Sequence, residues 1–292
     1  MALPRITVVT PSFNQGQFLE QAILSVLGQG YENLEYIVID GGSSDNSVDI
    51  IRRHEKKLSY WVSEKDGGQS EAINKGFAHA TGDILCWLNS DDFFLPGVLQ
   101  SVGRELHNGP DLIYGNCLSF SAEGGRCLVN RPPAYDQQLF GLKLCIVQPS
   151  SFWTRALWEK TGSLSPELHY AFDWEWYLRA AKNGNFRKSE VLYSAYRFHS
   201  AHKSGVGGDA RNREISKVAL ELGGEEVRSH YEFCLKYLNA LRQCEIWRLR
   251  LRGRGIASAD HIARWLVPTL WNLPPGIQFS KLRLCQGMFG NV

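Results

Sequence analysis

The fold of this chain is decided by the stretch Cys86-Trp87-Leu88-Asn89-Ser90-Asp91-Asp92. The apolar run 84–88 is typical of a buried strand, and two adjacent carboxylates follow shortly after its end. Neighbouring side chains on an extended segment point to opposite sides, so Asp91 and Asp92 are not both directed into one core. At the C-terminal edge of a parallel sheet, they would project into the crevice where open α/β folds bind ligands.

The two acids allow two interpretations. Carboxylate oxygens are preferred ligands of hard divalent cations such as Mg²⁺ and Mn²⁺, which also hold phosphates. Alternatively, the acids form an ordinary polar turn that closes the strand, with Asp92 capping the next helix. The rest of the chain favours the first interpretation.

Short β-rich runs alternate with helical segments in the first part of the chain. Strands are expected at residues 5–10, 34–39, 60–62 and 84–88, with helices between them. This alternation predicts an α/β fold with a mixed, mainly parallel sheet. Right-handed crossovers place the four strand C-termini on one edge, so the loops that follow them are expected to converge. These loops contain Thr10–Asn14, Asp40–Asp45, Gly67–Gly68 and Asp91–Asp92.

Less regular elements are expected beyond Pro96. One helix is expected from Pro96 to about residue 108, a second ends before Gly162, and a third covers 172–181. In the first part of the chain, the helix that begins after residue 43 is expected to be capped by Ser44 or Asp45. Further strands are expected over 111–120, 127–129, 148–153 and 191–195.

Composition is that of an ordinary soluble globular protein, with 43% hydrophobic and 21% charged residues among 292. The net charge of +2 hides an asymmetry, because residues 1–210 carry a balance of −4 and residues 211–292 a balance of +6. No segment approaches the roughly 18 consecutive apolar residues of a membrane span. A strand begins almost at once, so no signal peptide is expected, and seven Cys without a CxxC pair predict reduced cytosolic thiols.

Several sequence segments occur in a distinctive order and at distinctive intervals. They are Val9–Asn14, Ile39–Asp45, Ala72–Gly76 with Ala80–Asp83, Leu88–Asp92 and Asp173–Arg179. Together they resemble the family 2 inverting glycosyltransferases, which have the GT-A fold, a Rossmann-like fold that binds nucleotide-diphosphate sugars. The resemblance covers roughly residues 5–205. It implies transfer of a sugar from a nucleotide donor, expected to be UDP-linked, to a hydroxyl of a glycan or lipid-linked acceptor.

The resemblance also implies a division of the chain. We expect a GT-A catalytic domain over residues 1–208, with a nucleotide-binding half of about 1–95 and an acceptor half of about 96–208. A helical, basic extension over 209–292 is expected to follow.

Roles for the donor site follow from the same resemblance. Thr10, Pro11 and Phe13 would hold the nucleobase, with the Phe13 ring stacking on it. Asp40 would accept hydrogen bonds from the base or ribose, although an acid there can also serve as a helix-entry cap. The remaining nucleotide contacts would come from Asn74 and, to the ribose, Asp91.

A metal site is implied at Asp92, which would bind Mn²⁺ or Mg²⁺ between the two phosphates and so assist the leaving group. Asn89-Ser90 replaces the Asp-x-Asp spelling of some relatives, which leaves the metal stoichiometry open. His199, just after the last expected strand, would be a further ligand, with His202 as its competitor and a purely structural role as the alternative.

Two basic side chains are close to these histidines in the sequence. Arg197 and Lys203 would contact the diphosphate or, alternatively, are simply solvated.

The base that inversion requires is assigned to Asp173, at the start of the helix that carries it in relatives. Phe172 stands where many relatives have Glu, and an apolar neighbour tends to raise a carboxylate pKa. The alternative is that Asp173 caps the helix and Glu175 is the base. Nearby aromatic residues stack on an acceptor sugar or belong to the core, and the core is favoured. They are Trp153, Trp174 and Trp176.

The basic extension combines helical apolar spacing with clustered arginines beside Trp247. Those arginines are Arg242, Arg248, Arg250, Arg252 and Arg254. Such a segment lies on an anionic membrane surface, or it forms a helical hairpin packed on the catalytic domain or on a partner in an oligomer. Nothing in residues 1–210 supports nucleic-acid binding. A cytoplasmic protein, peripheral on the inner membrane face in the first case, is expected.

Two other functions compete with sugar transfer. One is a nucleotide-sugar-binding protein without transfer activity. The other is a nucleotidyltransferase, but this would need a Gly-rich phosphate loop with a basic residue, which Pro11–Gly16 lacks.

Overall fold

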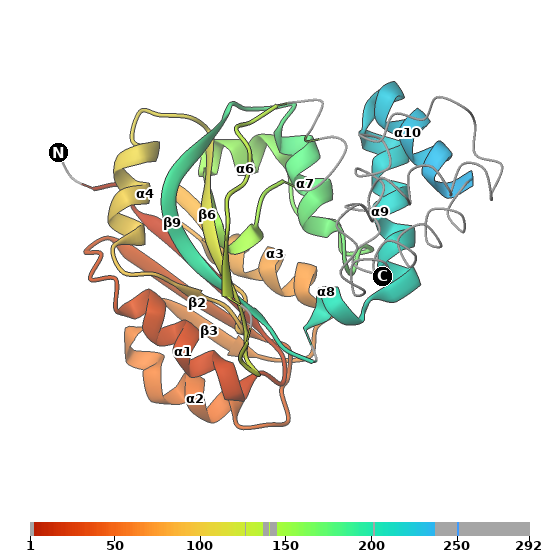
Figure 1. The fold of residues 1–292 in the computed structure, drawn as a ribbon. Coiled ribbons are helices and arrows are strands. Elements are labelled where there is room, and N and C mark those ends of the chain that lie inside the picture. The colour runs from red at the N-terminus through yellow and green to blue at the C-terminus, as the bar shows by residue number, and fades with distance from the viewer. Residues whose placement is uncertain are drawn as a thin grey trace. The chain divides into compact units, whose positions relative to one another are not determined.

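The structure, a computed structural model, describes residues 3–125, 127–136, 140, 145–200, 202–236 and 250. The chain divides into two compact units, one of residues 1–137 and 144–208 and the other of residues 138–143 and 209–292. In its described part, the first unit is a mixed α/β structure built on one sheet (Figure 1).

The sheet has nine strands in the spatial order β3-β2-β1-β4-β8-β6-β9-β5, with β7 also paired to β6. In chain order the strands are β1 (Ile6–Ser12), β2 (Leu34–Asp40), β3 (Tyr60–Ser63), β4 (Ile84–Trp87), β5 (Phe93–Phe94), β6 (Leu112–Ser121), β7 (Cys127–Asn130), β8 (Ser151–Thr154) and β9 (Phe186–Phe198). The first four are parallel to one another, as predicted. Antiparallel β8 joins them to the long parallel pair of β6 and β9, which curve together in Figure 1.

Helices cover both faces of this sheet. In chain order the helices described in this unit are α1 (Gly16–Leu27), α2 (Ser47–His54), α3 (Gln69–His79), α4 (Val98–Leu106), α6 (Arg155–Thr161), α7 (Phe172–Ala180) and the short α8 (Lys203–Val206), with 3₁₀ turns at Glu55–Lys57 and Gln148–Ser150. The second unit contains most of α9 (Gly208–Leu222) and all of α10 (Gly224–Lys236). None of the helices in the described part of the chain is long and apolar enough to cross a membrane.

Strand alternation creates two cores. One side of β1, β2 and β4 packs with α1, α2 and α4 in an aliphatic cluster that includes Val8, Ile23 and Val102. On the other side α3, α6 and α7 enclose an aromatic group in which the Phe77 ring lies 5.9 Å from that of Trp153. Helix α3 approaches closely at Gly76, where an added Cβ would lie 2.4 Å from a Val9 methyl group.

The structure differs from the expected elements at four places. Residues 148–150, expected to begin a strand, form a short 3₁₀ turn, and β8 begins at Ser151. The two-residue strand β5 was not expected, because two residues carry no periodicity and its partner β9 is distant in sequence. Strand β9 begins at Phe186 instead of residue 191, since its polar first half is held by β6. The residue before helix α2 is Asn46, which makes no side-chain cap bond, so the helix begins one residue later than a cap at Asp45 predicts. The Asp45 carboxylate still accepts a hydrogen bond from the N–H of Ser47, the first residue of the helix (3.0 Å).

Candidate active site

The loops after β1, β2 and β3 are joined by hydrogen bonds at the C-terminal edge of the sheet. The Asn14 amide N–H donates to Ser43 Oγ (2.7 Å), and Asn14 Oδ1 accepts from the Ser44 N–H (2.8 Å). The Ser63 hydroxyl at the end of β3 donates to Asp40 Oδ2 (2.7 Å). The predicted convergence of these loops is therefore confirmed.

The loop after β4 joins the same edge through a chain of polar side chains. Gln69 Nε2, at the start of α3, donates to Asn89 Oδ1 (2.7 Å), and Asn89 Nδ2 donates to Gln148 Oε1 (3.2 Å). The Lys203 ammonium donates to Gln69 Oε1 (3.0 Å). Asn89, which stands in the position of an acid in some relatives, thus connects β4 to α3. Lys203 is therefore part of this row of hydrogen-bonded side chains and is not merely solvated.

The two acids have different surroundings. Asp91 Oδ2 lies 3.1 Å from His199 Nε2, and His199 is 8% exposed. Asp92 is only 1% exposed, and its Oδ1 accepts a hydrogen bond from the Arg197 main-chain N–H (3.0 Å). Its Oδ2 is buried and has no hydrogen-bond partner. Burial, together with the charge of Asp91, raises the pKa of Asp92 well above its ordinary value.

These features test whether the residues fit a divalent cation. Within the described ranges no group of three Asp, Glu, His or Cys side chains forms a complete metal cage. The structure brings His199 to Asp91, whereas the sequence paired it with Asp92. The unpartnered Asp92 Oδ2 is nevertheless an acceptor that a cation would satisfy, and carboxylate with imidazole is a suitable ligand set for Mn²⁺. The residues therefore fit such an ion.

His202 and Arg197 have supporting positions. His202 Nδ1 lies 2.7 Å from the His199 carbonyl oxygen, so this ring atom is the donor and His202 braces the backbone of His199. The Arg197 guanidinium donates to the Asp91 carbonyl oxygen (2.9 Å) and to Gln21 Oε1. Arg197 is thus engaged with protein groups rather than simply solvated.

The residues expected at the nucleotide separate into exposed and enclosed groups. The Phe13 ring is 61% exposed at the end of β1, as stacking requires. Thr10 and Pro11 are buried, and Thr10 Oγ1 lies 3.0 Å from the Tyr36 hydroxyl. The structure does not bring Asn74 together with the other nucleotide candidates. Its side-chain amide instead makes two hydrogen bonds with the backbone of Leu164 (2.9 and 3.0 Å).

Asp40 is fully buried, and its carboxylate is bonded by its own loop and by the end of β3. It accepts from the N–H groups of Gly42 and Ser43 and from the Ser43 and Ser63 hydroxyls, at 2.6–3.2 Å. In this structure Asp40 holds the loop after β2 in shape. This role resembles the alternative expected from the sequence, a helix-entry cap.

Asp66 is an acid at this edge that the sequence did not single out. Its carboxylate lies over Gly41, where an added Cβ would be 2.9 Å from Asp66 Oδ2. It accepts a hydrogen bond from the Gly68 N–H (2.9 Å), and partial burial raises its pKa. An acid directly before the glycine pair of an expected loop was the signal that could have identified it.

Helix α7 presents Asp173 in its first turn. The residue before the helix is Ala171, and Asp173 Oδ1 accepts from the Trp174 N–H (2.7 Å), so Asp173 is not the N-cap. Asp173 is half-buried. The adjacent Phe172 ring lies 6.3 Å from the ring of Trp87, the last residue of β4. The start of α7 is therefore held near the end of the strand that leads to the acids.

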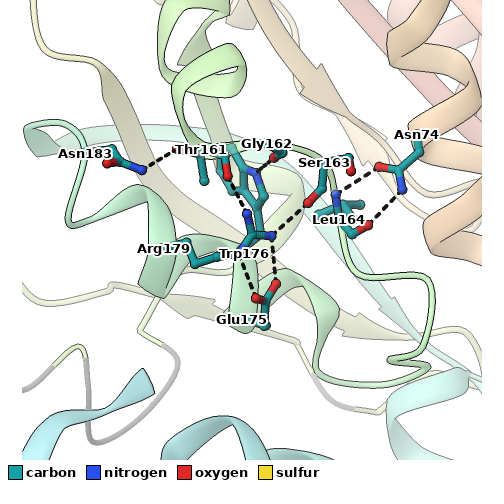
Figure 2. A network of polar contacts seen from close by, with 9 residues as sticks. All are labelled: Asn74, Thr161, Gly162, Ser163, Leu164, Glu175, Trp176, Arg179 and Asn183. Carbon is teal, nitrogen blue, oxygen red and sulfur yellow. Dashed lines mark hydrogen bonds and ion pairs between the residues drawn. The ribbon is translucent and has the colours of Figure 1, made fainter. Parts of the chain in front are cut away.

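Glu175 has a structural environment, shown in Figure 2. It binds Arg179 through two hydrogen bonds (2.7 and 2.9 Å), and Arg179 in turn donates to the carbonyl oxygens of Thr161 and Ser163. Trp176 donates to the Gly162 carbonyl oxygen (2.9 Å). The three tryptophans belong to the core, the alternative that the sequence favoured. Each is at most 2% exposed: Trp153, Trp174 and Trp176.

We expect Glu175→Gln to leave sugar transfer within about threefold of the wild-type rate and to lower the free energy of unfolding by about 1–2 kcal/mol, because one charge-assisted pair is lost. Denaturant unfolding and a transfer assay measure the two effects. Glu159→Gln is the control, since its pair with Arg155 is 3.9 Å long and exposed. A loss of activity without a loss of stability would return Glu175 to the list of candidate bases.

Comparison with known proteins shows which family the chain matches. Residues 7–158 match the model of Glycosyl transferase family 2. An uncharacterized glycosyltransferase of Mycobacterium tuberculosis is 33% identical over 194 residues, which cover 61% of this chain and 69% of that one. The GalNAc(5)-diNAcBac-PP-undecaprenol beta-1,3-glucosyltransferase of Campylobacter jejuni is 31% identical over 120 residues, 40% of this chain and 39% of that protein.

Solved structures show the same fold. S. aureus TarS 1-349, crystallised with UDP-GlcNAc, superposes with a TM-score of 0.61 at 17% identity, over 80% of this chain and 72% of that one. The mannosyltransferase PcManGT from Pyrobaculum calidifontis, in complex with GDP-Man and Mn²⁺, gives a TM-score of 0.58 at 17% identity, over 98% and 86%. The family match and the fold thus define a glycosyltransferase with the GT-A fold. The chain belongs to Glycosyl transferase family 2.

Proposed function

We propose that this protein transfers a sugar from a UDP-sugar to a hydroxyl group of a glycan or lipid-linked acceptor, with inversion and with a divalent cation. The observation that carries the proposal is the buried Asp92 Oδ2, which lacks a partner beside the Asp91–His199 pair. A buried carboxylate oxygen without a hydrogen-bond partner is costly, and a cation bound beside a diphosphate would supply that partner.

In this proposal Asp92 and the Asp91–His199 pair hold the cation, Mn²⁺ or Mg²⁺. When bound, the cation stabilises the negative charge that develops on the departing nucleoside diphosphate. The exposed Phe13 ring stacks on the nucleobase. In place of the roles first expected of them, Asp40 shapes the loop after β2 and Thr10 bonds the neighbouring strand through Tyr36.

Asp173 acts as the base in this proposal. It removes the proton from the acceptor hydroxyl as that oxygen attacks the sugar carbon on the side opposite the diphosphate. Two observations support Asp173 over Glu175: it is not the N-cap of α7, whereas Glu175 is occupied by Arg179.

Acceptor and location are proposed from the extension and the relatives. The name of the Campylobacter jejuni relative describes an undecaprenol-linked acceptor, and we propose a lipid-linked or glycan acceptor here. The basic extension would hold the enzyme at the inner face of the membrane, in the cytoplasm. Apart from Arg250, its clustered arginines and Trp247 lie outside the described residues.

The test is a screen of UDP-, GDP- and dTDP-sugars for release of the nucleoside diphosphate, with Mn²⁺, Mg²⁺ or chelator and with or without membrane extract. The proposal expects cation-dependent release from one UDP-sugar that increases with extract. Binding without release would instead identify a nucleotide-sugar-binding protein. Release that is unaffected by chelator would contradict the metal role.

A further inference from the structure

Arg197 joins the end of β9 to both acids. Its main-chain N–H donates to Asp92 Oδ1 (3.0 Å), and its side-chain Nε donates to the Asp91 carbonyl oxygen (2.9 Å). The far end of the guanidinium donates to Gln21 Oε1 (2.5 Å) on α1. One residue therefore contacts each acid by a separate group and ties them to a helix.

Aromatic rings surround this guanidinium. Its central carbon lies 4.6 Å from the ring centroid of Phe18, 4.8 Å from that of Phe120 and 5.8 Å from that of Phe93. Cations at such distances are attracted to ring faces. The rings come from α1, β6 and β5, so three elements fix the position of the charge.

The backbone around Arg197 continues the same connection. Strand β5 directly follows the acids and pairs with β9 through Phe93 and Ala195, and the Leu95 N–H donates to the Tyr193 carbonyl oxygen (2.9 Å). His199, two residues beyond Arg197, contacts Asp91. Residues 91–95 are thus held along their length by residues 193–199, with the Arg197 side chain filling the space between this pair and α1.

We propose that Arg197 is a positioning residue for the cation-binding acids: its guanidinium fixes the Asp91 backbone and, through it, the carboxylates. This inference rests on the proposed function. A planar, forked guanidinium can bond Asp91 and Gln21 at once while its faces lie against rings, which an ammonium cannot reproduce. Groups that orient metal ligands commonly change metal affinity by 10–100-fold when removed.

The test compares Arg197→Met, Arg197→Lys and wild type by titrating Mn²⁺ in the presence of UDP, with the electron paramagnetic resonance signal of free Mn²⁺ as readout. Arg197→Met is expected to raise the apparent Kd for Mn²⁺ by about 10–100-fold, and Arg197→Lys by less. In the transfer assay the half-saturating Mn²⁺ concentration rises by the same factor, while the rate at saturating Mn²⁺ stays within about threefold.

Arg187→Met is the matched control. Arg187 lies on the same strand, and its guanidinium donates to the Glu105 carbonyl oxygen (2.9 Å) away from the acids. We expect it to leave the Kd for Mn²⁺ unchanged. Phe120→Leu removes one ring and keeps the hydrogen bonds, so a Kd increase of about two- to fivefold is expected even if Arg197→Met does not fold.

The outcomes separate this inference from the proposed function. If wild type binds no Mn²⁺ with UDP, the metal role fails. If wild type binds Mn²⁺ and Arg197→Met binds it equally well, the positioning role alone is overturned. A lower Tm with unchanged Mn²⁺ affinity would likewise overturn it and make Arg197 a purely structural residue.

Discussion

Asp173→Asn is expected to lower the rate of sugar transfer by about 10²–10⁴-fold, the contribution typical of a positioned base, and to leave donor binding within about twofold of wild type. The reason is that the amide cannot accept the proton of the acceptor hydroxyl, while its oxygen still accepts the Trp174 N–H bond. Transfer of a labelled sugar to membrane extract gives the rate, and calorimetry with the UDP-sugar gives the affinity.

Glu175→Gln is the matched control for this experiment, because it neutralises an acid two residues further along the same helix. The control should remain active while Asp173→Asn does not. Retention of more than about a tenth of the wild-type rate by Asp173→Asn would show that another group takes the proton.

Asp92→Asn is expected to reduce cation-dependent transfer by about 10³-fold, since a bound cation contributes several kcal/mol of charge stabilisation. In metal-free protein the same change should raise Tm, because it removes a buried charge that has no partner at Oδ2 and that faces Asp91. Thermal unfolding in chelator and Mn²⁺ titration with UDP measure the two effects.

If the variant is inactive and its metal-free Tm is higher, the Asp92 carboxylate destabilises the metal-free protein and is needed for cation binding. Asp49→Asn is the control, since that acid lies on the surface in a 3.6 Å pair with Arg52 and should change neither quantity. A fall in metal-free Tm for Asp92→Asn would mean that the carboxylate is a structural acceptor, and the metal assignment would be wrong.

The part of the fold made of local, periodic elements was predictable. The first four strands and their helices each carry their own hydrophobic pattern, and the parallel order follows from the handedness of βαβ connections. Strand β5 was not predictable, because only its pairing with β9, about a hundred residues later, makes Phe93 and Phe94 a strand. A different long-range pairing, with β6, extends β9 into residues that look like a polar loop.

The sequence predicted where on the sheet the site residues lie better than it predicted their hydrogen-bond partners. The strand pattern placed Asp91 and Asp92 at one edge, and the family resemblance added His199, but neither indicated that His199 contacts Asp91. Asn74 fits a family motif, yet its amide is used on the backbone of Leu164. Hydrogen-bond partners of this kind depend on side-chain orientation, which neither spacing nor composition encodes.

The pairing of residues 91–95 with 193–199 has a consequence for biosynthesis. Domains begin to fold while the chain is still emerging from the ribosome, and contacts between distant residues form late. The bond from Arg197 to Asp92 spans 105 positions, so a nascent chain that has acquired its first four strands still lacks the clamp on its acids. We expect stalled chains ending near residue 190 to be protease-resistant in their first part yet unable to retain Mn²⁺, and cation retention by such chains would contradict this order of events.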